Sequence, residues 1–491
     1  MSYVLGIDLG TSGIKVVLVG EEGGIAATSS AAYPLLKPRS SWVEQNPEDW
    51  WQALCEAVWA VLEEAGISAL QIGGVALSGQ INGAVFVDRR GELLRNAMIW
   101  LDQRSQDECD RGNELAGDLF RQQAMIQLSP VNTLAKVLWI RRHQPEVYDR
   151  AGALLAPKDW LNFALTGVVK AEISDASTTG AFNLHERCWS GEILDRLELK
   201  EELFQSLVES TEQVGEVSKA AAEATGLAPG TPVFGGGGDM PCMVLGSGVI
   251  SPGIVSVGIG TAGHAITFAE CIDEAAFNKL WPMCHVIPGN YAWLGCTLTG
   301  GASMNWFRDV FDATYEELNR EAAAVPPGAE GLVFMPWLEG AATPHPDPRA
   351  RAGFLGLSLR HNRGHMARAL MEGVALDLRH SLECFSSMGL PIREVRMGEG
   401  GSRSVLWRQI HAEVFGRELR LIETEDLSAV GAALLAGVGA GVFAGFSHAC
   451  EAVIKLGKTV RCSPAGKDFY EAAYQRHCRL YPMLQTWYGQ A

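Results

Sequence analysis

The sequence predicts an α/β protein with two domains of similar design that face each other across a cleft. Its length of 491 residues exceeds the ~250–300 residues at which a single hydrophobic core stops growing, so two large domains are expected. A short pattern also occurs twice, as IDLGTSG at residues 7–13 and as VGIGTAG at residues 257–263, each time between two apolar segments. Several apolar segments end in glycine-rich loops. We therefore expect one domain over residues 1–248 and a second over residues 249–491.

The first domain begins with alternating apolar runs and turns, which predict an antiparallel meander with strands at residues 3–10, 14–20 and 25–30. Asn46 and Pro47 then form an N-cap and a first helical position, and the helix is expected to end at Gly66. The following strand and loop, IGGVALSGQ at residues 72–80, have a fainter counterpart in IREVRMGEGG at residues 392–401. This second match supports the two-domain prediction.

Composition and net charge argue against some kinds of binding partner. Apolar residues make up 47% and charged residues 20% of the chain, close to the average of a packed globular protein. The formal net charge of −17 repels nucleic-acid backbones and anionic lipid, which argues against nucleic acid or a membrane as the main partner. The eleven cysteines are scattered without a CxxC pair, and the first residues lack the pattern of a secretory signal. These features predict a cytoplasmic protein with reduced thiols.

One uncharged segment, AVGAALLAGVGAGVFAGF at residues 429–446, reaches the length of ~18 residues at which a membrane span is considered. It consists mostly of Gly and Ala, so its transfer into lipid would be weakly favourable. Small residues equally suit a helix that packs closely inside a protein, and we expect a buried helix here.

The two Gly-Thr-Gly loops are candidate nucleotide sites. A turn of this kind exposes successive backbone N–H groups and a hydroxyl, which together attract phosphate, although an ordinary tight hairpin has the same sequence. Residues 258–263 also match the dinucleotide pattern GxGxxG, but the segment that follows, HAITF, predicts a strand where that motif requires a helix. The chain has no Walker A motif.

Two acidic residues follow predicted strands. Asp8 lies beside the hydroxyls of Thr11 and Ser12, where a carboxylate could hold Mg²⁺ against phosphate or merely organise its turn. Asp239 follows the glycine run Gly235–Gly238 and precedes an apolar, helix-like stretch. The run is either a flexible linker or a means of clearing space around a carboxylate that takes a proton from an acceptor hydroxyl.

Taken together, these segments resemble the FGGY carbohydrate kinases over nearly the whole chain, and most of all the xylulokinase branch. The matching segments are IDLGTSG (7–13), SWVEQNPEDWW (41–51), SGQINGAVFVD (78–88), IWLDQR (99–104), LAKVLWIRRHQPE (134–146), GGGGDM (235–240), VGIGTAG (257–263), ATPHPDPRARAGFLGL (342–357) and GEGGSRSVLWRQI (398–410). The resemblance implies two actin-like ATPase (ribonuclease H-like) domains around a central cleft. It further implies ATP-dependent phosphorylation of a ketopentose, with D-xylulose 5-phosphate as the leading product.

The resemblance also implies roles for individual residues. Asp239 would be the catalytic base and Asp8 the acid near Mg²⁺. The residues implied on the ATP side are Thr11, Ser12, Lys15, Gly260, Thr261, Gly301, Asn305, Gly400, Gly401 and Val405. Those implied on the sugar side are Gln80, Ile81, Asn82, Asp102, Arg104 and Met240. For two of them a structural role stays open, because Asn305 could be an ordinary polar residue of a helix and Arg104 could pair with an acid.

The sequence departs from the pattern of xylulokinases at the sugar loop. Those enzymes typically have Gln-Met-His-Gly where this chain has Gln80-Ile81-Asn82-Gly83, and Asp-Asn where it has Asp239-Met240. Loss of polar contacts can change discrimination by factors of ~10⁴, so another pentulose, a polyol or glycerol stays an alternative substrate. A non-catalytic actin-like ATPase is a more distant alternative, and a homodimer is an open alternative to a monomer.

Overall fold

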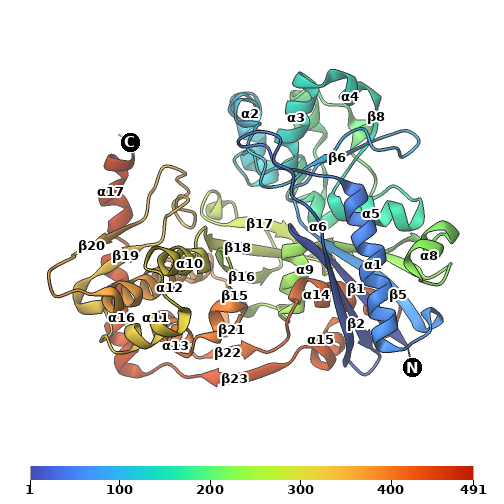
Figure 1. Cartoon of the computed structure of the whole chain (residues 1–491). Helices are drawn as coiled ribbons and strands as arrows, with labels where there is room; N and C mark the ends of the chain where they lie inside the picture. Colours follow the sequence, from blue (N-terminus) through green and yellow to red (C-terminus); the bar gives the residue numbers. More distant parts are fainter. Residues whose placement is uncertain (1, 490–491) are drawn as a thin grey trace.

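The computed structural model describes residues 2–489, and two mixed β-sheets form its framework (Figure 1). The first sheet has the strand order β13-β14-β5-β1-β2-β3. Its strands are β1 (Tyr3–Leu9), β2 (Gly13–Gly20), β3 (Ile25–Ala32), β5 (Ile72–Gly79), β13 (Gln213–Glu216) and β14 (Pro232–Gly238). The predicted meander and the strand after it are therefore confirmed.

The second sheet has the order β17-β18-β16-β15-β21-β22-β23. Its strands are β15 (Gly253–Ile259), β16 (Gly263–Ala269), β17 (Trp281–Cys284), β18 (Tyr291–Thr297), β21 (Ile392–Gly398), β22 (Leu419–Ile422) and β23 (Leu456–Val460). The segment HAITF lies in β16, as expected from its extended pattern.

The two sheets share one topology. In the first, β1 pairs antiparallel with β2 and parallel with β5, and β14 pairs parallel with β5 and antiparallel with β13. The second sheet repeats these pairings. There, β15 pairs antiparallel with β16 and parallel with β21, and β22 pairs parallel with β21 and antiparallel with β23. The two short sequence matches thus mark equivalent positions in a structural repeat.

Helix α1 (Pro47–Ala65) covers one face of the first sheet and has the predicted ends. The Asn46 side chain accepts a hydrogen bond from the N–H of Glu48 at 3.2 Å, and Gly66 ends the helix with a φ of 62°, which glycine adopts without strain. Trp50 is fully buried against the sheet. The N-terminal core forms between this helix and strands β1, β2 and β5.

Helices α9 (Asp239–Gly246) and α14 (Leu427–Gly439) lie between the two sheets (Figure 1). Alanine and leucine residues of α14 pack against valines of β1 and β2, so an element from the second half of the chain covers the first sheet. The α14 part of the uncharged segment is therefore a buried helix as expected, but residues 440–445 form a partly exposed turn that leads into α15 (Phe446–Val453). None of the helices within residues 2–489 combines the length and apolar character that a membrane span requires.

A lobe inserted between β5 and β13 stands above the first sheet (Figure 1). Its elements are β6 (Val85–Asp88), β7 (Ala97–Met98), α2 (Gln106–Leu119), α3 (Thr133–His143), α4 (Pro145–Arg150), β8 (Ala151–Leu155), α5 (Pro157–Thr166), β9 (Ala171–Glu172), α6 (Ile173–Ala176), β10 (Phe182–Asn183), β11 (Cys188–Trp189), α7 (Gly191–Arg196) and β12 (Leu207–Val208). Most of the lobe shares an apolar core of its own around Phe86, Phe120 and Trp139. Helix α5 packs instead against the first sheet, with Trp160 and Leu161 in the N-terminal core.

The second sheet is covered mainly by α12 (Arg363–Ser387), whose buried residues form the centre of the largest core. The other elements are β4 (Glu44–Gln45), α8 (Lys219–Thr225), α10 (Gly301–Val310), α11 (Tyr315–Ala323), β19 (Val333–Met335), β20 (Gly353–Leu355), α13 (Val405–Phe415), α16 (Pro464–His477) and α17 (Leu480–Tyr488). The loops at the ends of β15, β21 and α10 meet and form the site described next.

Candidate active site

Asp239 begins helix α9, directly after strand β14. Its Oδ1 accepts a hydrogen bond from the N–H of Met240 at 2.8 Å, and its carboxylate also accepts one from the backbone of Ile81. The Ser428 hydroxyl, at the start of α14, donates to the backbone carbonyl of Asp239 at 3.1 Å. The carboxylate is therefore held where the sugar-side loop, α9 and α14 meet.

The glycines before Asp239 belong to β14 and are not a flexible linker. Gly236 has a φ of +73°, which a residue with a Cβ rarely adopts. A Cβ on Gly236 would lie 1.9 Å from the carbonyl oxygen of Leu77, and one on Gly238 would lie 2.4 Å from Cγ2 of Ile81. The linker interpretation is wrong, because the glycines let β14 approach the neighbouring strand and loop closely.

Asp8 and Asp239 form a pair of neighbouring carboxylates. The Ser78 hydroxyl donates to Asp8 Oδ1 at 2.7 Å, and burial raises the pKa of Asp8. Burial, and then the charge of Asp8, raise the pKa of Asp239 to about 7. Two neighbouring carboxylates repel each other when both are ionised, and a divalent cation with oxygen ligands would relieve that repulsion. The residues present therefore fit Mg²⁺.

A pocket of about 500 Å³ lies in the second half, between the end of β15 and helices α10 and α13. Of the ATP-side residues, it brings together Gly260, Thr261, Gly301, Asn305, Gly400 and Gly401. Its walls also include Met304, Tyr315, Asn319, Met371 and Trp407, which the sequence analysis missed. An apolar floor beside polar groups and exposed glycine backbone is suited to a nucleoside.

The glycines of this pocket are required by close backbone contacts. The N–H of Gly301 donates to the carbonyl of Gly260 at 2.8 Å, and the N–H of Ala302 donates to that of Thr261 at 3.0 Å. A Cβ on Gly301 would lie 2.3 Å from the Gly260 oxygen. Asn305, on α10, accepts a hydrogen bond from the Tyr315 hydroxyl. Val405 is 67% exposed and does not line this pocket.

A second pocket, of about 630 Å³, continues from the first towards Asp8. The two pockets share Gly400 and Arg403, and the second is also lined by Lys15 and Asp426. Lys15 forms an ion pair with Asp426, so the first sheet and the start of α14 are joined across this pocket. The two pockets together trace a continuous path from Trp407 to Asp8.

Thr11 and Ser12 lie outside both pockets. The Thr11 hydroxyl accepts a hydrogen bond from the Trp100 indole at 3.0 Å, and its carbonyl accepts one from the Gln45 amide at 2.7 Å. Ser12 is exposed. The structure therefore does not bring the first Gly-Thr-Gly loop against Thr261.

Of the sugar-side residues, Ile81 and Met240 contact Asp239 directly through their backbone. Gln80 and Asn82 are buried, with Asn82 at a φ of 64°, and Ile81 between them contacts the Asp239 loop. Gln80 Oε1, Asn82 Oδ1 and Arg104 Nη1 are buried without a hydrogen-bond partner in the part of the chain that the structure describes. Met240 is partly buried and packs against the apolar cluster below α9. Buried polar atoms without partners are costly and rare, so these atoms are suited to bind a hydroxylated ligand.

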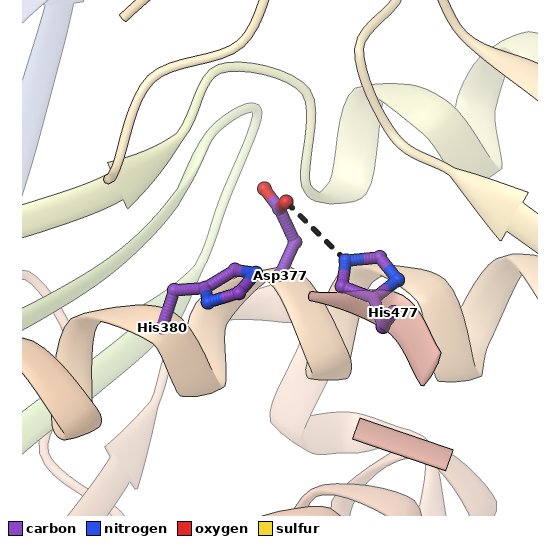
Figure 2. Close-up of side chains that lie close together, drawn as sticks. All are labelled: Asp377, His380 and His477. Atoms are coloured by element: carbon purple, nitrogen blue, oxygen red, sulfur yellow. Dashed lines mark ion pairs between the residues drawn. The ribbon is translucent and has the colours of Figure 1, made fainter. Parts of the chain in front are cut away.

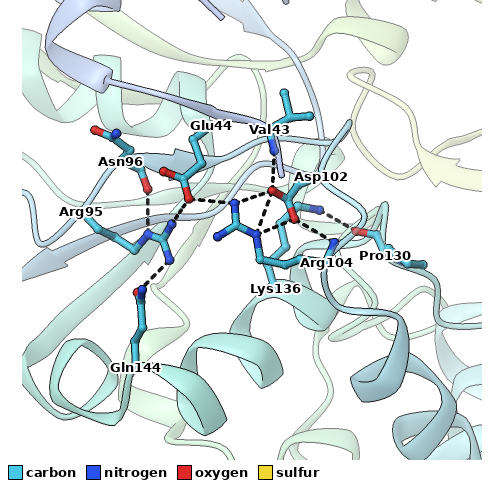
Figure 3. A network of polar contacts seen from close by, with 9 residues as sticks. All are labelled: Val43, Glu44, Arg95, Asn96, Asp102, Arg104, Pro130, Lys136 and Gln144. Carbon is cyan, nitrogen blue, oxygen red and sulfur yellow. Dashed lines mark hydrogen bonds and ion pairs between the residues drawn. The ribbon is translucent and has the colours of Figure 1, made fainter. Parts of the chain in front are cut away.

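Figure 3 shows how Asp102 and Arg104 are held. The Arg104 guanidinium donates to Asp102 Oδ2 at 2.6 Å and to Glu44 Oε1 at 2.7 Å, and it stacks over the Trp42 ring at 3.7 Å from the centroid. Asp102 Oδ2 also accepts from the N–H of Val43 at 2.7 Å. Arg104 thus pairs with acids, which is the structural role that the sequence left open. Its Nη1 has no hydrogen-bond partner among the described residues.

Lys136 completes this network from helix α3. Its ammonium is fully buried and donates to the carbonyls of Pro130 at 2.9 Å and Val131 at 2.7 Å, and burial lowers its pKa to about 7. Glu44 and Lys136 were missed as site residues, although both lie in segments that carry the family resemblance. Their contribution depends on contacts between distant segments, which single motifs do not reveal.

Comparisons with known proteins agree with this geometry. Residues 3–246 match the N-terminal domain of the FGGY family of carbohydrate kinases, and residues 264–440 match the C-terminal domain. The chain is 35% identical to the xylulose kinase of Bacillus subtilis over 93% of its own length and 92% of that protein. It is 31% identical to the xylulose kinase of Escherichia coli, covering 89% of this chain and 90% of that one. The crystal structure of xylulose kinase from Rhodospirillum rubrum superimposes with a TM-score of 0.93 at 30% identity, covering 99% of this chain and all of that one.

Proposed function

The chain belongs to the FGGY family of carbohydrate kinases, and we propose that it transfers the γ-phosphoryl group of ATP to the terminal hydroxyl of D-xylulose, giving D-xylulose 5-phosphate. The observation that carries the proposal is the position of Asp239. Its carboxylate accepts a hydrogen bond from the backbone of Ile81 in the sugar-side loop and neighbours Asp8, which lines the second pocket. That is where an acceptor hydroxyl and a phosphate would have to meet.

In this mechanism the sugar binds first to the loop of Gln80 and Asn82. Their unpartnered oxygens accept hydrogen bonds from sugar hydroxyls, and the free Nη1 of Arg104 donates to a sugar oxygen. The O5 hydroxyl then faces Asp239, which takes its proton as O5 bonds to the γ-phosphorus and the bond to the β-phosphate oxygen breaks. An Asp with a pKa of about 7 suits this role, because near neutral pH about half of it is ionised and the ionised form is a stronger base than an ordinary carboxylate.

On the nucleotide side, Trp407 and Met304 would contact the base, and the backbone of Gly260, Thr261 and Gly401 would line the path of the phosphates. Lys15 would exchange Asp426 for phosphate. Asp8 would hold Mg²⁺, which when bound neutralises charge that develops on the phosphate oxygens. Thr11 and Ser12 would reach the γ-phosphate only when the two halves approach each other.

Similarity to xylulose kinases over nearly the whole chain supports xylulose as the sugar. The Ile81-Asn82 pair and Met240 keep related pentuloses and polyols as competing substrates, because these side chains surround Asp239. We also propose action in the cytoplasm, in line with eleven free cysteines. A homodimer stays the alternative to a monomer, and sedimentation of the purified protein distinguishes the two.

The decisive experiment measures ADP release by purified protein with Mg²⁺, ATP and a panel of sugars. D-Xylulose should give the highest kcat/KM among ketopentoses, ketohexoses, ribitol and glycerol, and the product should be the 5-phosphate by NMR. A higher kcat/KM with another member of the panel would replace xylulose and leave the kinase assignment intact. ADP release that no sugar stimulates would overturn both.

A further inference from the structure

A second cluster of titratable side chains lies in the C-terminal half, and none of its residues lines the two nucleotide pockets. Asp377 and His380 extend from helix α12, and His477 extends towards them from the last turn of α16 (Figure 2). One ligand atom from each of the three lies within 4.8 Å of the other two. The kinase mechanism uses none of them.

Several polar atoms of this cluster are buried and unsatisfied. Asp377 and His477 are each only 3% exposed. Within residues 2–489, Asp377 Oδ2 and both ring nitrogens of His477 have no hydrogen-bond partner, and the Asp377 Oδ1 to His477 Nε2 distance is 3.7 Å. Leaving such groups unpaired costs about 1–3 kcal/mol each, so their concentration at one point suggests a missing ligand.

The remaining atoms of the cluster are oriented by neighbours, as metal ligands usually are. The Trp337 indole donates at 3.1 Å to Asp377 Oδ1, the oxygen that lies 3.7 Å from His477 Nε2, and Oδ2 has no hydrogen-bond partner among the described residues. The Tyr474 hydroxyl lies 2.9 Å from His380 Nδ1, which leaves Nε2 of that ring available. Outer partners of this kind fix the tautomer and the orientation of ligating side chains.

A further imidazole lies beside the cluster. His345 lies near enough to Asp377 and His380 to influence their charges, and its ring stacks on Tyr481 at 4.5 Å between centroids.

We propose that Asp377, His380 and His477 bind one divalent transition-metal ion, with Zn²⁺ as the best match, and that water or His345 completes its coordination. Two imidazoles and one carboxylate favour such an ion over Mg²⁺ or Ca²⁺, which prefer oxygen ligands. Zn²⁺ with bond lengths of ~2.0–2.1 Å needs its ligand atoms ~3.3 Å apart, so the cluster contracts slightly on binding. His477 has no hydrogen bond to lose in that movement. The bound ion ties α16 to α12.

The test is calorimetric titration of Zn²⁺ into chelator-treated full-length protein, with excess Mg²⁺ present to occupy the kinase site. We expect one high-affinity equivalent per chain, weakened at least ~100-fold in Asp377→Asn and His477→Gln. Zn²⁺ should also raise the melting temperature of the wild type and leave that of these variants unchanged. Co²⁺ in place of Zn²⁺ should give the intense visible absorption of a four-coordinate site.

His411→Gln is the matched control. His411 is a buried histidine of the same half whose Nε2 also has no partner among the described residues, but it has no carboxylate or second imidazole beside it in a ligand cluster. The control should bind Zn²⁺ like the wild type. If Asp377→Asn fails to fold, the Zn²⁺ affinity of His380→Gln is measured in its place. His380 is the most exposed of the three, so its substitution disturbs the fold least. The proposal is overturned if the wild type binds no stoichiometric Zn²⁺, or if the ligand variants bind it as well as the control does.

Discussion

At the scale of single residues, the proposed role of Asp239 as catalytic base comes at a cost in stability. Its folded-state pKa of about 7 exceeds the ordinary 3.8, so the folded protein binds the proton more tightly than the unfolded chain does. The stability that this proton provides is fully present below pH ~3.8 and is lost as the pH rises through about 7. The ionised Asp239 that the reaction needs is therefore the destabilising form.

We predict that Asp239→Asn lowers kcat by about 10²–10⁴-fold, the usual contribution of a general base, and leaves the Kd for ATP nearly unchanged. In the wild type, kcat/KM should rise with pH and level off above about 7, because the free enzyme must lose the proton of Asp239. Stopped ADP-release assays from pH 5 to pH 9 measure this. Normal turnover in the variant would remove Asp239 from the mechanism.

The same substitution should raise the melting temperature. Asn cannot ionise and its Oδ1 still accepts from the N–H of Met240, so at pH 8 the variant avoids a cost of about 2–4 kcal/mol. The gain should shrink as the pH is lowered towards 4. Calorimetric melting at several pH values tests this, and a gain that does not vary with pH would contradict the raised pKa.

Asn82 allows a separate test of the sugar side. Asn82→Gly keeps the φ of 64° accessible and removes the buried amide whose Oδ1 has no partner within residues 2–489. Loss of one hydrogen bond to substrate should lower kcat/KM for the sugar by about 10–100-fold and leave the KM for ATP unchanged. Initial-rate kinetics measure both constants. Equal loss on both substrates would indicate damage to the fold and not to a sugar contact.

Sequence motifs predicted the pocket residues that belong to short loops directly after strands. Gly260, Thr261 and Gly401 follow strands of the repeat, and the structure places all three in one pocket. Val405 was predicted on the nucleotide side but lies outside the pockets, because it begins α13 on the exposed side of that helix. Glu44 could not be predicted, since its partners Arg95 and Arg104 come from a later segment of the lobe.

At the scale of elements, the close approach of α9 and α14 positions the catalytic residue. A Cβ on Gly431 of α14 would lie 1.9 Å from the carbonyl oxygen of Cys242 in α9, so the two helices pack backbone against backbone. The sequence predicted a buried helix from the Gly and Ala content of residues 429–446. It did not reveal what the helix packs against, because small residues show only that an approach is possible.

We predict that Gly431→Ala separates these helices. Alanine favours a helix by about 1 kcal/mol, but the clash with immovable backbone costs more, so a net loss of about 1–3 kcal/mol is expected. Because Asp239 begins α9, a shift of ~1 Å should also lower kcat by about 10²-fold. Urea denaturation and ADP-release assays give the two quantities.

Gly117→Ala is the control for this change. Gly117 lies in α2, and a Cβ there would meet no heavy atom of the described residues within 4 Å. The control should be neutral or slightly stabilising and fully active. If Gly431→Ala behaves like it, the helices tolerate separation and the close approach does not position Asp239.

At the scale of the whole molecule, the structural repeat places the proposed sugar site and the proposed nucleotide site in different halves. The sugar-side loop follows β5 of the first sheet, and the nucleoside pocket follows β15 and β21 of the second. Two short matches were enough to predict this repeat, since both lie where strands end in functional loops. The inserted lobe has no counterpart in the repeat, and only its own contacts define its fold.

We predict that the halves move together when both substrates bind. Reacting atoms must come within ~3–3.5 Å, and Thr11 and Ser12 line neither the pocket that contains Thr261 nor the one that continues towards Asp8. We predict that xylulose together with a non-hydrolysable ATP analogue lowers the radius of gyration in small-angle X-ray scattering, and that the sugar or the analogue alone has a smaller effect. The same measurement on Asp239→Asn separates closure from catalysis, because this variant keeps both binding sites and should close like the wild type. A radius that stays constant under conditions of full kinase activity would mean that the phosphate reaches Asp239 in the open arrangement, without contacts from Thr11 and Ser12.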